Sequence, residues 1–191
     1  MPEIEDLAPR IRGPREAAAY DGRIDPDELR AKHLDVVAKA AYHNLRAYGN
    51  CCRSTLWSLG THLRLEGAGA LRAASTLAGG IGGTGETCGA VIGALMALGL
   101  RFGSDAPADL ECATCARNAA VRFVERFRER FGSTRCYEIQ EATVGWRCDD
   151  PSLIEKWIAA DGPIACAAVC AEAARLAADL MLDEEDKGKR V

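Results

Sequence analysis

The sequence has few aromatic residues, few runs of β-branched residues and no excess of positive charge. Only 6% of its 191 residues are Phe, Trp or Tyr, whereas Ala and Leu are abundant. This composition favours closely packed helices over sheets. The net charge of −4 and the pI of about 5.5 give no basic footprint for nucleic acid or for an anionic membrane. We therefore predict a helical protein that does not bind nucleic acid.

Long hydrophobic runs are also missing. The longest apolar stretch, residues 88–100, is thirteen residues long and contains three glycines, whereas about twenty apolar residues are needed to cross a bilayer. The first residues, Met1 to Asp6, are acidic and lack the basic and apolar regions of a secretory signal. We therefore expect a cytoplasmic protein with no membrane partner.

Cysteine, by contrast, is abundant, with nine in the chain. In the cytoplasm disulfides seldom persist, and clustered thiols more often bind metal or take part in redox chemistry. An odd number of thiols also cannot all pair within one chain. A free cysteine is nevertheless often only a small core residue. The positions of the nine thiols therefore carry more information than their number.

The chain divides by composition into three parts. Residues 1–24 contain three prolines and no hydrophobic period, and we predict an extended N-terminal arm. Asp25 and Pro26 then form a helix-start signal. Helical periodicity continues to residue 184, no segment is typical of a strand, and residues 185–191 are a charged tail. The prediction is an all-α, single-domain multi-helix bundle over residues 25–184, with a glycine-rich loop at residues 79–85.

Start and stop signals divide the bundle into successive helices. A proline opens the long fifth helix, a serine caps the short sixth one, and a glycine-proline pair introduces the last. The expected boundaries are residues 25–49, 50 to about 63, 70–78, 87 to about 100, 107–132, and helices starting at Ser133, Asp150 and Gly162.

Four cysteines share a position in these predicted helices. Cys51, Cys88 and Cys136 fall at or near helix starts, and Cys166 falls in the first turn after Gly162 and Pro163. At a helix start the dipole and the free backbone N–H groups stabilise a thiolate and lower the pKa of the thiol. A thiolate is the form that binds metal and reduces disulfides. Because core filling would scatter cysteines along helix interiors, we predict these four as metal ligands.

Three further cysteines give weaker signals. Cys112 and Cys115 form a CxxC motif on one side of the long helix. This motif lacks the βαβ context of a thioredoxin motif, and no second CxxC completes a zinc ribbon. Cys52 points about 100° away from Cys51 around the helix and is expected to pack in the core.

The last two cysteines are alternative or additional ligands. Cys170 lies one turn after Cys166, on the same helix face, and could replace it. Cys148, in a loop beside Trp146, could be a fifth ligand or a lid residue. The sequence contains no CxxCH motif, so no covalent haem is expected.

The glycine-rich loop contains Gly80-x-Gly82-x-x-Gly85, which matches the dinucleotide-binding string. That motif needs a preceding strand and a βαβ unit, neither of which is predicted here. A loop without side chains instead lets backbone N–H groups approach a bound group closely. We expect Gly82, Gly83 and Gly85 to contribute such N–H groups to a cofactor.

Several of these segments together resemble one protein family. They are Asn50-Cys51, the loop 79–85, the stretch 88–100, Phe131 to Cys136, and Cys166. The family is that of the redox-active proteins named for a C…GCAxxG…C…C pattern, which split-Soret cytochromes c also resemble. The similarity covers about residues 30–180. The chain departs from the pattern in reading Cys88-Gly89-Ala90-x-x-Gly93, because the pattern has glycine before the cysteine.

The resemblance implies a small helical, mostly cytoplasmic protein with a redox or iron–sulfur role. It places the four motif cysteines at Cys51, Cys88, Cys136 and Cys166. Our leading hypothesis is an iron–sulfur redox protein in which these thiolates bind one [4Fe–4S] or [2Fe–2S] centre between helix N-termini. Such a protein would transfer electrons to a redox partner protein or activate a small-molecule substrate.

Two alternatives from other functional classes remain. One is a thiol–disulfide enzyme or sensor, with a reversible Cys51–Cys88 disulfide that Cys136 or Cys166 resolves. The other is a structural zinc-binding module that assembles partners. The proline-rich arm and the small residues of the stretch 88–100 further predict a homodimer.

Overall fold

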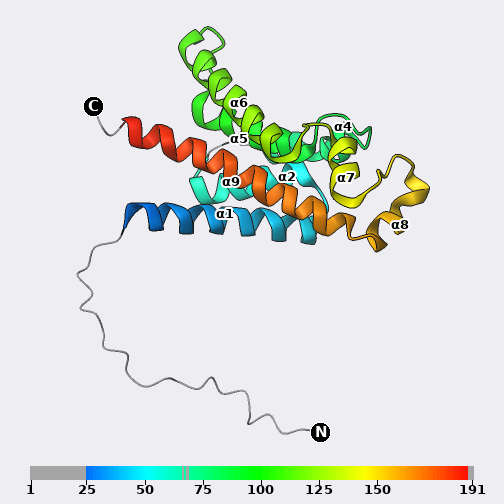
Figure 1. Ribbon diagram of the computed structural model, residues 1–191. Coiled ribbons are helices and arrows are strands. Elements are labelled where there is room, and N and C mark those ends of the chain that lie inside the picture. The colour runs from blue at the N-terminus through cyan, green and yellow to red at the C-terminus, as the bar shows by residue number, and fades with distance from the viewer. Residues whose placement is uncertain (1–24, 66, 68, 189–191) are drawn as a thin grey trace, which may run out of the picture.

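The first helix, α1 (Pro26–Tyr48), begins and ends at the signals found in the sequence. The Asp25 side chain accepts a hydrogen bond from the backbone N–H of Asp27 at 2.9 Å, and Pro26 occupies the first turn. Gly49 ends the helix in the left-handed conformation, at φ 68°. The computed structural model describes residues 25–65, 67 and 69–188 (Figure 1), so the predicted N-terminal arm lies outside the described residues.

Every regular element in the described residues is helical, which confirms the all-α, multi-helix prediction. Within that part of the chain, the one β-type pairing is an isolated bridge between Thr87 and Arg135. The last helix, α9 (Gly162–Gly188), runs antiparallel along α1 (Figure 1). It continues through residue 188, so most of the predicted charged tail extends this helix.

A half-buried ion network joins α1, α6 (Leu110–Phe131) and α9. Arg30 of α1 lies 2.7 Å from a carboxylate oxygen of Asp179 and 2.5 Å from one of Asp183, both on α9. Arg126 of α6 reaches the other oxygen of Asp179 at 3.0 Å. Because a helix rises about 1.5 Å per residue, Asp179 lies far along α9 from Cys166. The network therefore holds the three helices together at the end of the bundle away from Cys166.

The helices α2 (Cys51–Leu63) and α5 (Gly89–Phe102) pack closely because α5 carries small residues. A Cβ atom at Gly93 would overlap the carbonyl oxygen of Cys52 on α2. These small residues, which the sequence offered for a homodimer contact, are buried within the chain: Gly89, Ala90, Gly93, Ala94 and Ala97. Of the two features that predicted a homodimer, this leaves the proline-rich arm of residues 1–24. None of the helices in the described segments is long and apolar enough to cross a membrane.

Gly93→Ala is expected to lower the free energy of unfolding by about 1–3 kcal/mol, because its methyl group forces α2 and α5 apart. The atom it meets is backbone, which cannot rotate away. Gly99→Ala, in the same helix, is the matched control because a Cβ there meets nothing within 4 Å. That variant should gain about 0.5–1 kcal/mol from helix propensity. Urea unfolding of both variants measures the difference, and equal effects would contradict the packing.

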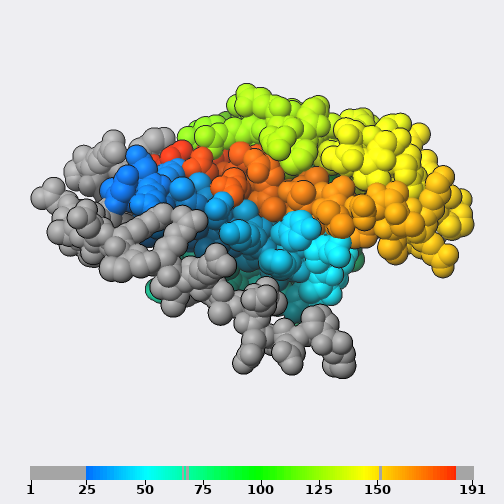
Figure 2. Space-filling model, turned by 60° about the horizontal axis from the view of Figure 1, so that its bottom comes forward, coloured from blue at the N-terminus to red at the C-terminus, as the bar shows by residue number. Residues whose placement is uncertain are grey.

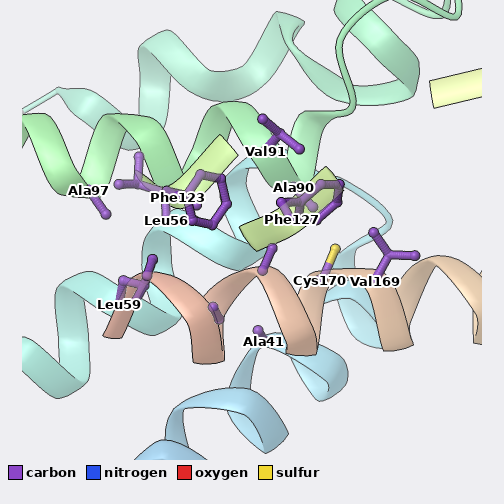
Figure 3. Packing of buried hydrophobic residues seen from close by; sticks show 14 of the residues in the cluster. Ala41, Leu56, Leu59, Ala90, Val91, Ala97, Phe123, Phe127, Val169 and Cys170 are labelled. Atoms are coloured by element: carbon purple, nitrogen blue, oxygen red, sulfur yellow. The ribbon is translucent and has the colours of Figure 1, made fainter. Parts of the chain in front are cut away.

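The helix α6 contributes Phe123 and Phe127 to the core of the bundle, where both side chains are fully buried (Figure 3). Phe127 also stacks on Phe131, with ring centroids 4.7 Å apart. This helix begins at Leu110 and not at Pro107 as predicted. The reason is Asp109, whose side chain accepts the backbone N–H of Cys112 at 3.0 Å. This cap makes Leu110 the first residue of the helix.

The segment predicted as one helix over residues 70–78 is divided into short elements. They are α3 (Ala70–Ala73), the 3₁₀ helix η2 (Ala74–Thr76) and α4 (Ala78–Ile81). Inside α4, Gly79 and Gly80 have φ angles of 64° and 72°, so no continuous helix can pass through them.

The remaining short elements follow α6: α7 (Cys136–Val144), η3 (Pro151–Leu153) and α8 (Ile154–Ala159). Ser133 does not cap α7 as predicted; its hydroxyl accepts the backbone N–H of Arg135, which is the N-cap residue. Figures 1 and 2 show that α7 and α8 form one end of the molecule, beside the start of α9 and away from the start of α1.

Candidate cysteine-lined site

A cavity of about 470 Å³ lies at this end of the bundle, between α2, α5, α7, α8 and α9. The four predicted ligands all line it, although they are far apart in the sequence and come from four different helices or helix starts. Six of the nine cysteines contribute to its wall: Cys51, Cys88, Cys136, Cys148, Cys166 and Cys170. All nine are free thiols. The thiols outside this wall are Cys52, Cys112 and Cys115.

A short antiparallel backbone pairing holds Cys88 and Cys136 side by side. The N–H of Cys88 donates to the carbonyl oxygen of Thr134 at 2.8 Å, and the N–H of Cys136 donates to that of Glu86 at 2.7 Å. These bonds flank the isolated bridge described above. The starts of α5 and α7 therefore converge, and the two thiols lie within hydrogen-bond reach of each other.

Cys51 is the first residue of α2, and Asn50 fixes this helix start. The Asn50 side-chain oxygen caps α2, and its amide N–H donates to the carbonyl oxygen of Ser75 at 3.0 Å. The Cys51 sulfur faces the backbone N–H of Gly79. It also lies against Gly89, where a Cβ atom would overlap it. The glycine that follows Cys88 is thus required by the close approach of Cys51.

Cys166 and Cys170 lie one turn apart on α9, and both border the cavity. Cys166 is one turn beyond Gly162, the first residue of α9, so the prediction that it falls in the first turn is wrong. Its own N–H is therefore not one of the free groups of the helix start. Cys170 is fully buried, points from α9 into the packed interior (Figure 3), and donates a long hydrogen bond of 3.8 Å to the Cys51 carbonyl oxygen.

Burial reverses the pKa shift that was expected for these thiols. It raises the pKa of Cys51 to about 11 and that of Cys166 to about 12. The hydrogen bond with the Cys136 thiol, together with burial, raises the pKa of Cys88 well above its usual value. Backbone N–H groups at the start of α5 favour the Cys88 thiolate, although its sulfur closes no capping hydrogen bond. The prediction of low-pKa thiols is therefore wrong for these three, because burial dominates at Cys51 and Cys166 and the hydrogen bond with Cys136 adds to burial at Cys88.

The glycine-rich loop reaches the cavity through Gly79 and Gly83. Gly82 and Gly85, which were also predicted to contribute N–H groups, lie outside the cavity lining. The ring of Tyr137 covers Gly85 so closely that a Cβ there would overlap it. The Tyr137 hydroxyl donates to the carbonyl oxygen of Gly83 at 2.8 Å. The sequence showed no signal for this contact, because it joins a loop and a helix that are distant in the chain.

Gln140 of α7 links two cysteines of the cavity and was not predicted from the sequence. Its amide N–H donates to the Cys136 sulfur at 3.6 Å, and its oxygen accepts the backbone N–H of Cys148 at 2.8 Å. Only 7% of Gln140 is exposed, so both bonds are shielded from water. Its position one turn after Cys136, on the same helix face, is a signal that sequence reasoning missed.

Trp157 of α8 forms another part of the cavity wall. Its ring packs on Gly162 at the start of α9. The indole N–H is buried and has no hydrogen-bond partner among the described residues. A buried donor without an acceptor costs about 1–3 kcal/mol, and the indole nitrogen lies against Gly162 at the start of α9.

The side chains of the cavity are not gathered around one point. Within the described ranges, no group of three or more Cys, His, Asp or Glu residues is arranged to hold a single metal ion. A single zinc ion needs its ligands at about 2.0–2.3 Å from one centre. A polynuclear iron–sulfur cluster spaces its thiolate ligands more widely, because they bind different irons.

Comparison with curated proteins and with solved structures gives no match. A family model with the description "Putative redox-active protein (C_GCAxxG_C_C)" matches residues 49–180, which is more than half of the chain. Where the family's pattern has glycine before its second cysteine, this chain has Thr87, which forms the bridge to Arg135. The matched range contains all nine cysteines of the chain, Cys51, Cys88, Cys136 and Cys166 among them. The chain therefore belongs to the C_GCAxxG_C_C family of redox-active proteins.

Proposed function

We propose that this protein binds an iron–sulfur cluster through Cys51, Cys88, Cys136 and Cys166 and uses it in redox chemistry. The observation that carries the proposal is the meeting of these four thiols, from four separate helices or helix starts, in one cavity. Core packing alone does not require four distant cysteines to face the same open space. Thiolates are the usual protein ligands of iron–sulfur clusters.

The surroundings of the cavity fit a sulfur-rich anionic group. Backbone N–H groups face the sulfurs of Cys51 and Cys88, and the Gln140 amide donates to Cys136. Hydrogen bonds of this kind offset negative charge on sulfur and tune the reduction potential.

Binding of iron would replace the thiol protons of the four cysteines, since a coordinating thiol is deprotonated outright. When bound, an iron–sulfur cluster supplies one-electron transfer. The chain itself would hold the ligands in place and exclude water with apolar residues of the cavity wall, including Ile139, Trp157 and Val169. The reaction partner in this proposal is a redox protein or a small molecule that reaches the cavity.

Anaerobic purification of the full chain, followed by an absorption spectrum and by iron and acid-labile sulfide analysis, tests the proposal. We expect a brown protein with visible absorbance and matching amounts of iron and sulfide. Colourless protein with stoichiometric zinc would replace the proposal by the structural zinc module. Colourless protein with a titratable disulfide would replace it by the thiol–disulfide enzyme or sensor.

Gln140→Leu is expected to shift the reduction potential of the bound cluster to a more negative value. The variant removes the amide N–H that donates to the Cys136 sulfur, and a hydrogen bond to a ligand sulfur favours the reduced, more negative state. Redox titration followed by absorbance measures the shift. Glu141→Gln, an exposed change at the next position of α7, is the control and should leave the potential almost unchanged. An unaltered potential in Gln140→Leu would exclude this role for the amide.

A further inference from the structure

Cys112 and Cys115 lie near the start of α6, apart from the cysteine-lined cavity. Cys115 is exposed and Cys112 is partly exposed. Cys115 borders a second hollow of about 350 Å³, which is lined by Phe102, Cys115, Asn118, Ala119 and Arg122. This part of the surface therefore combines an accessible thiol pair with a hollow that the proposed cluster does not use.

The hollow presents one cationic and one amide side chain beside the Cys115 thiol. Cys115, Asn118 and Arg122 are spaced by three and four residues on α6, so they lie on one face of the helix. Phe102, the last residue of α5, adds an apolar wall. A thiol is thus bordered by an amide and by a guanidinium, which is the usual partner of a carboxylate.

The two thiols differ in environment. The Asp109 side chain accepts the backbone N–H of Cys112 at 3.0 Å, and the same carboxylate raises the pKa of Cys112. The carboxylate therefore disfavours the Cys112 thiolate, whereas Cys115 is the exposed thiol that borders the hollow. This difference favours Cys115 as the attacking group and Cys112 as the group that reacts second.

The helical spacing allows the two sulfurs to join. Cβ atoms three residues apart in an α-helix are about 5–6 Å apart, and a disulfide needs about 3.5–4.5 Å. Tightening one turn toward 3₁₀ geometry brings side chains at i and i+3 into line. Such tightening is common at helix starts, and Cys112 lies in the first turn of α6, three residues after the N-cap residue Asp109.

We propose that Cys112 and Cys115 are a thiol–disulfide exchange site for anionic low-molecular-weight disulfides, distinct from the cysteine-lined cavity. The Cys115 thiolate attacks one sulfur of the disulfide, whose S–S bond breaks, and the departing thiolate takes a proton from water. Cys112 then releases its proton to water and attacks the Cys115 sulfur, forming the Cys112–Cys115 disulfide. The second thiolate leaves and is protonated. The protein dithiol has lost two electrons and two protons, and the substrate disulfide has become two thiols.

The test uses the full-length native protein, kept anaerobic, with three disulfides of different charge. They are oxidised glutathione, which is anionic, bis(2-hydroxyethyl) disulfide, which is neutral, and cystamine, which is cationic. Mass spectrometry of the peptide containing residues 112 and 115 follows the products. Relative to a free cysteine derivative, we expect oxidised glutathione to react about fivefold faster than cystamine, the effect of one exposed charge at close range.

Variants separate the steps of the exchange. Cys112→Ser should stop at a mixed disulfide on Cys115, whereas the unaltered chain should proceed to the internal disulfide. Arg122→Gln should remove the preference for the anionic probe, and Arg122→Lys should restore most of it. A lasting mixed disulfide on Cys115 in the unaltered chain would overturn the exchange site. Equal relative rates for the three probes would overturn the anionic specificity. Both results are independent of whether the cavity holds a cluster.

Discussion

Replacing Cys88 by serine is expected to remove the iron–sulfur chromophore completely. Cys88 is only 6% exposed and lies beside Cys136, within hydrogen-bond reach of its thiol. A serine hydroxyl has nearly the same size but is not the thiolate that iron–sulfur clusters require. The absorption spectrum and the iron and sulfide content of the anaerobically purified variant measure the loss. Circular dichroism in the same sample shows whether the helices have formed.

Cys52→Ser is the matched control for this loss. Cys52 neighbours Cys51 in the sequence and is fully buried, but its thiol faces the Met96 sulfur at 3.9 Å and does not line the cavity. The hydroxyl would cost about 1–3 kcal/mol of stability because it is buried without a partner, and Cys52→Ala avoids that cost. Both variants should keep the chromophore. A colourless Cys52→Ala protein beside a brown Cys88→Ser protein would contradict the ligand assignment.

Helix starts and their cysteines could be predicted because the signals are local. Asp25 and Asn50 accept backbone N–H groups two or three residues further along the chain, so a few letters of sequence determine each start. The position of Cys51 at the start of α2 follows from such a signal. The start of α6 was misplaced because Pro107 and Asp109 are competing local signals, and the Asp109 cap is the one that forms.

The chemistry of the thiols could not be predicted from those signals. A helix start favours a thiolate only when the sulfur stays near water, and burial is set by the packing of distant helices. The backbone pairing that brings Cys88 beside Cys136 joins segments that are far apart in the sequence. The contact of Gln140 with Cys148 crosses a loop, so its partner was not visible from the period of α7. Sequence alone therefore selected four thiols that line one cavity, but it did not predict the environment they share.

Gly80 of the glycine-rich loop also makes a contact with a distant segment that local sequence signals do not predict. Its φ angle is 72°, and a Cβ atom there would lie 2.6 Å from the backbone nitrogen of Glu86 and 2.7 Å from the Cβ of Cys136. The Gly80 carbonyl oxygen accepts the N–H of Glu86 at 3.1 Å, and the Glu86 carbonyl oxygen accepts the N–H of Cys136. Gly80 thus supports the backbone pairing that positions two of the proposed ligands. The dinucleotide string in the sequence contains Gly80 but gives no hint of this contact.

Gly80→Ala is therefore expected to lower the free energy of unfolding by about 2–5 kcal/mol, from left-handed strain and overlap with backbone. Gly82→Ala isolates the strain, because its φ of 66° is similar but its nearest neighbour, the Thr76 carbonyl oxygen, is 3.8 Å from the added Cβ. That control should lose only about 1–2 kcal/mol. Urea unfolding and iron content measured on both variants separate the two contributions. Because Gly80, unlike Gly82, lies against Cys136, its variant should also lose iron. Equal iron content in the two proteins would show that Gly80 does not position the ligands.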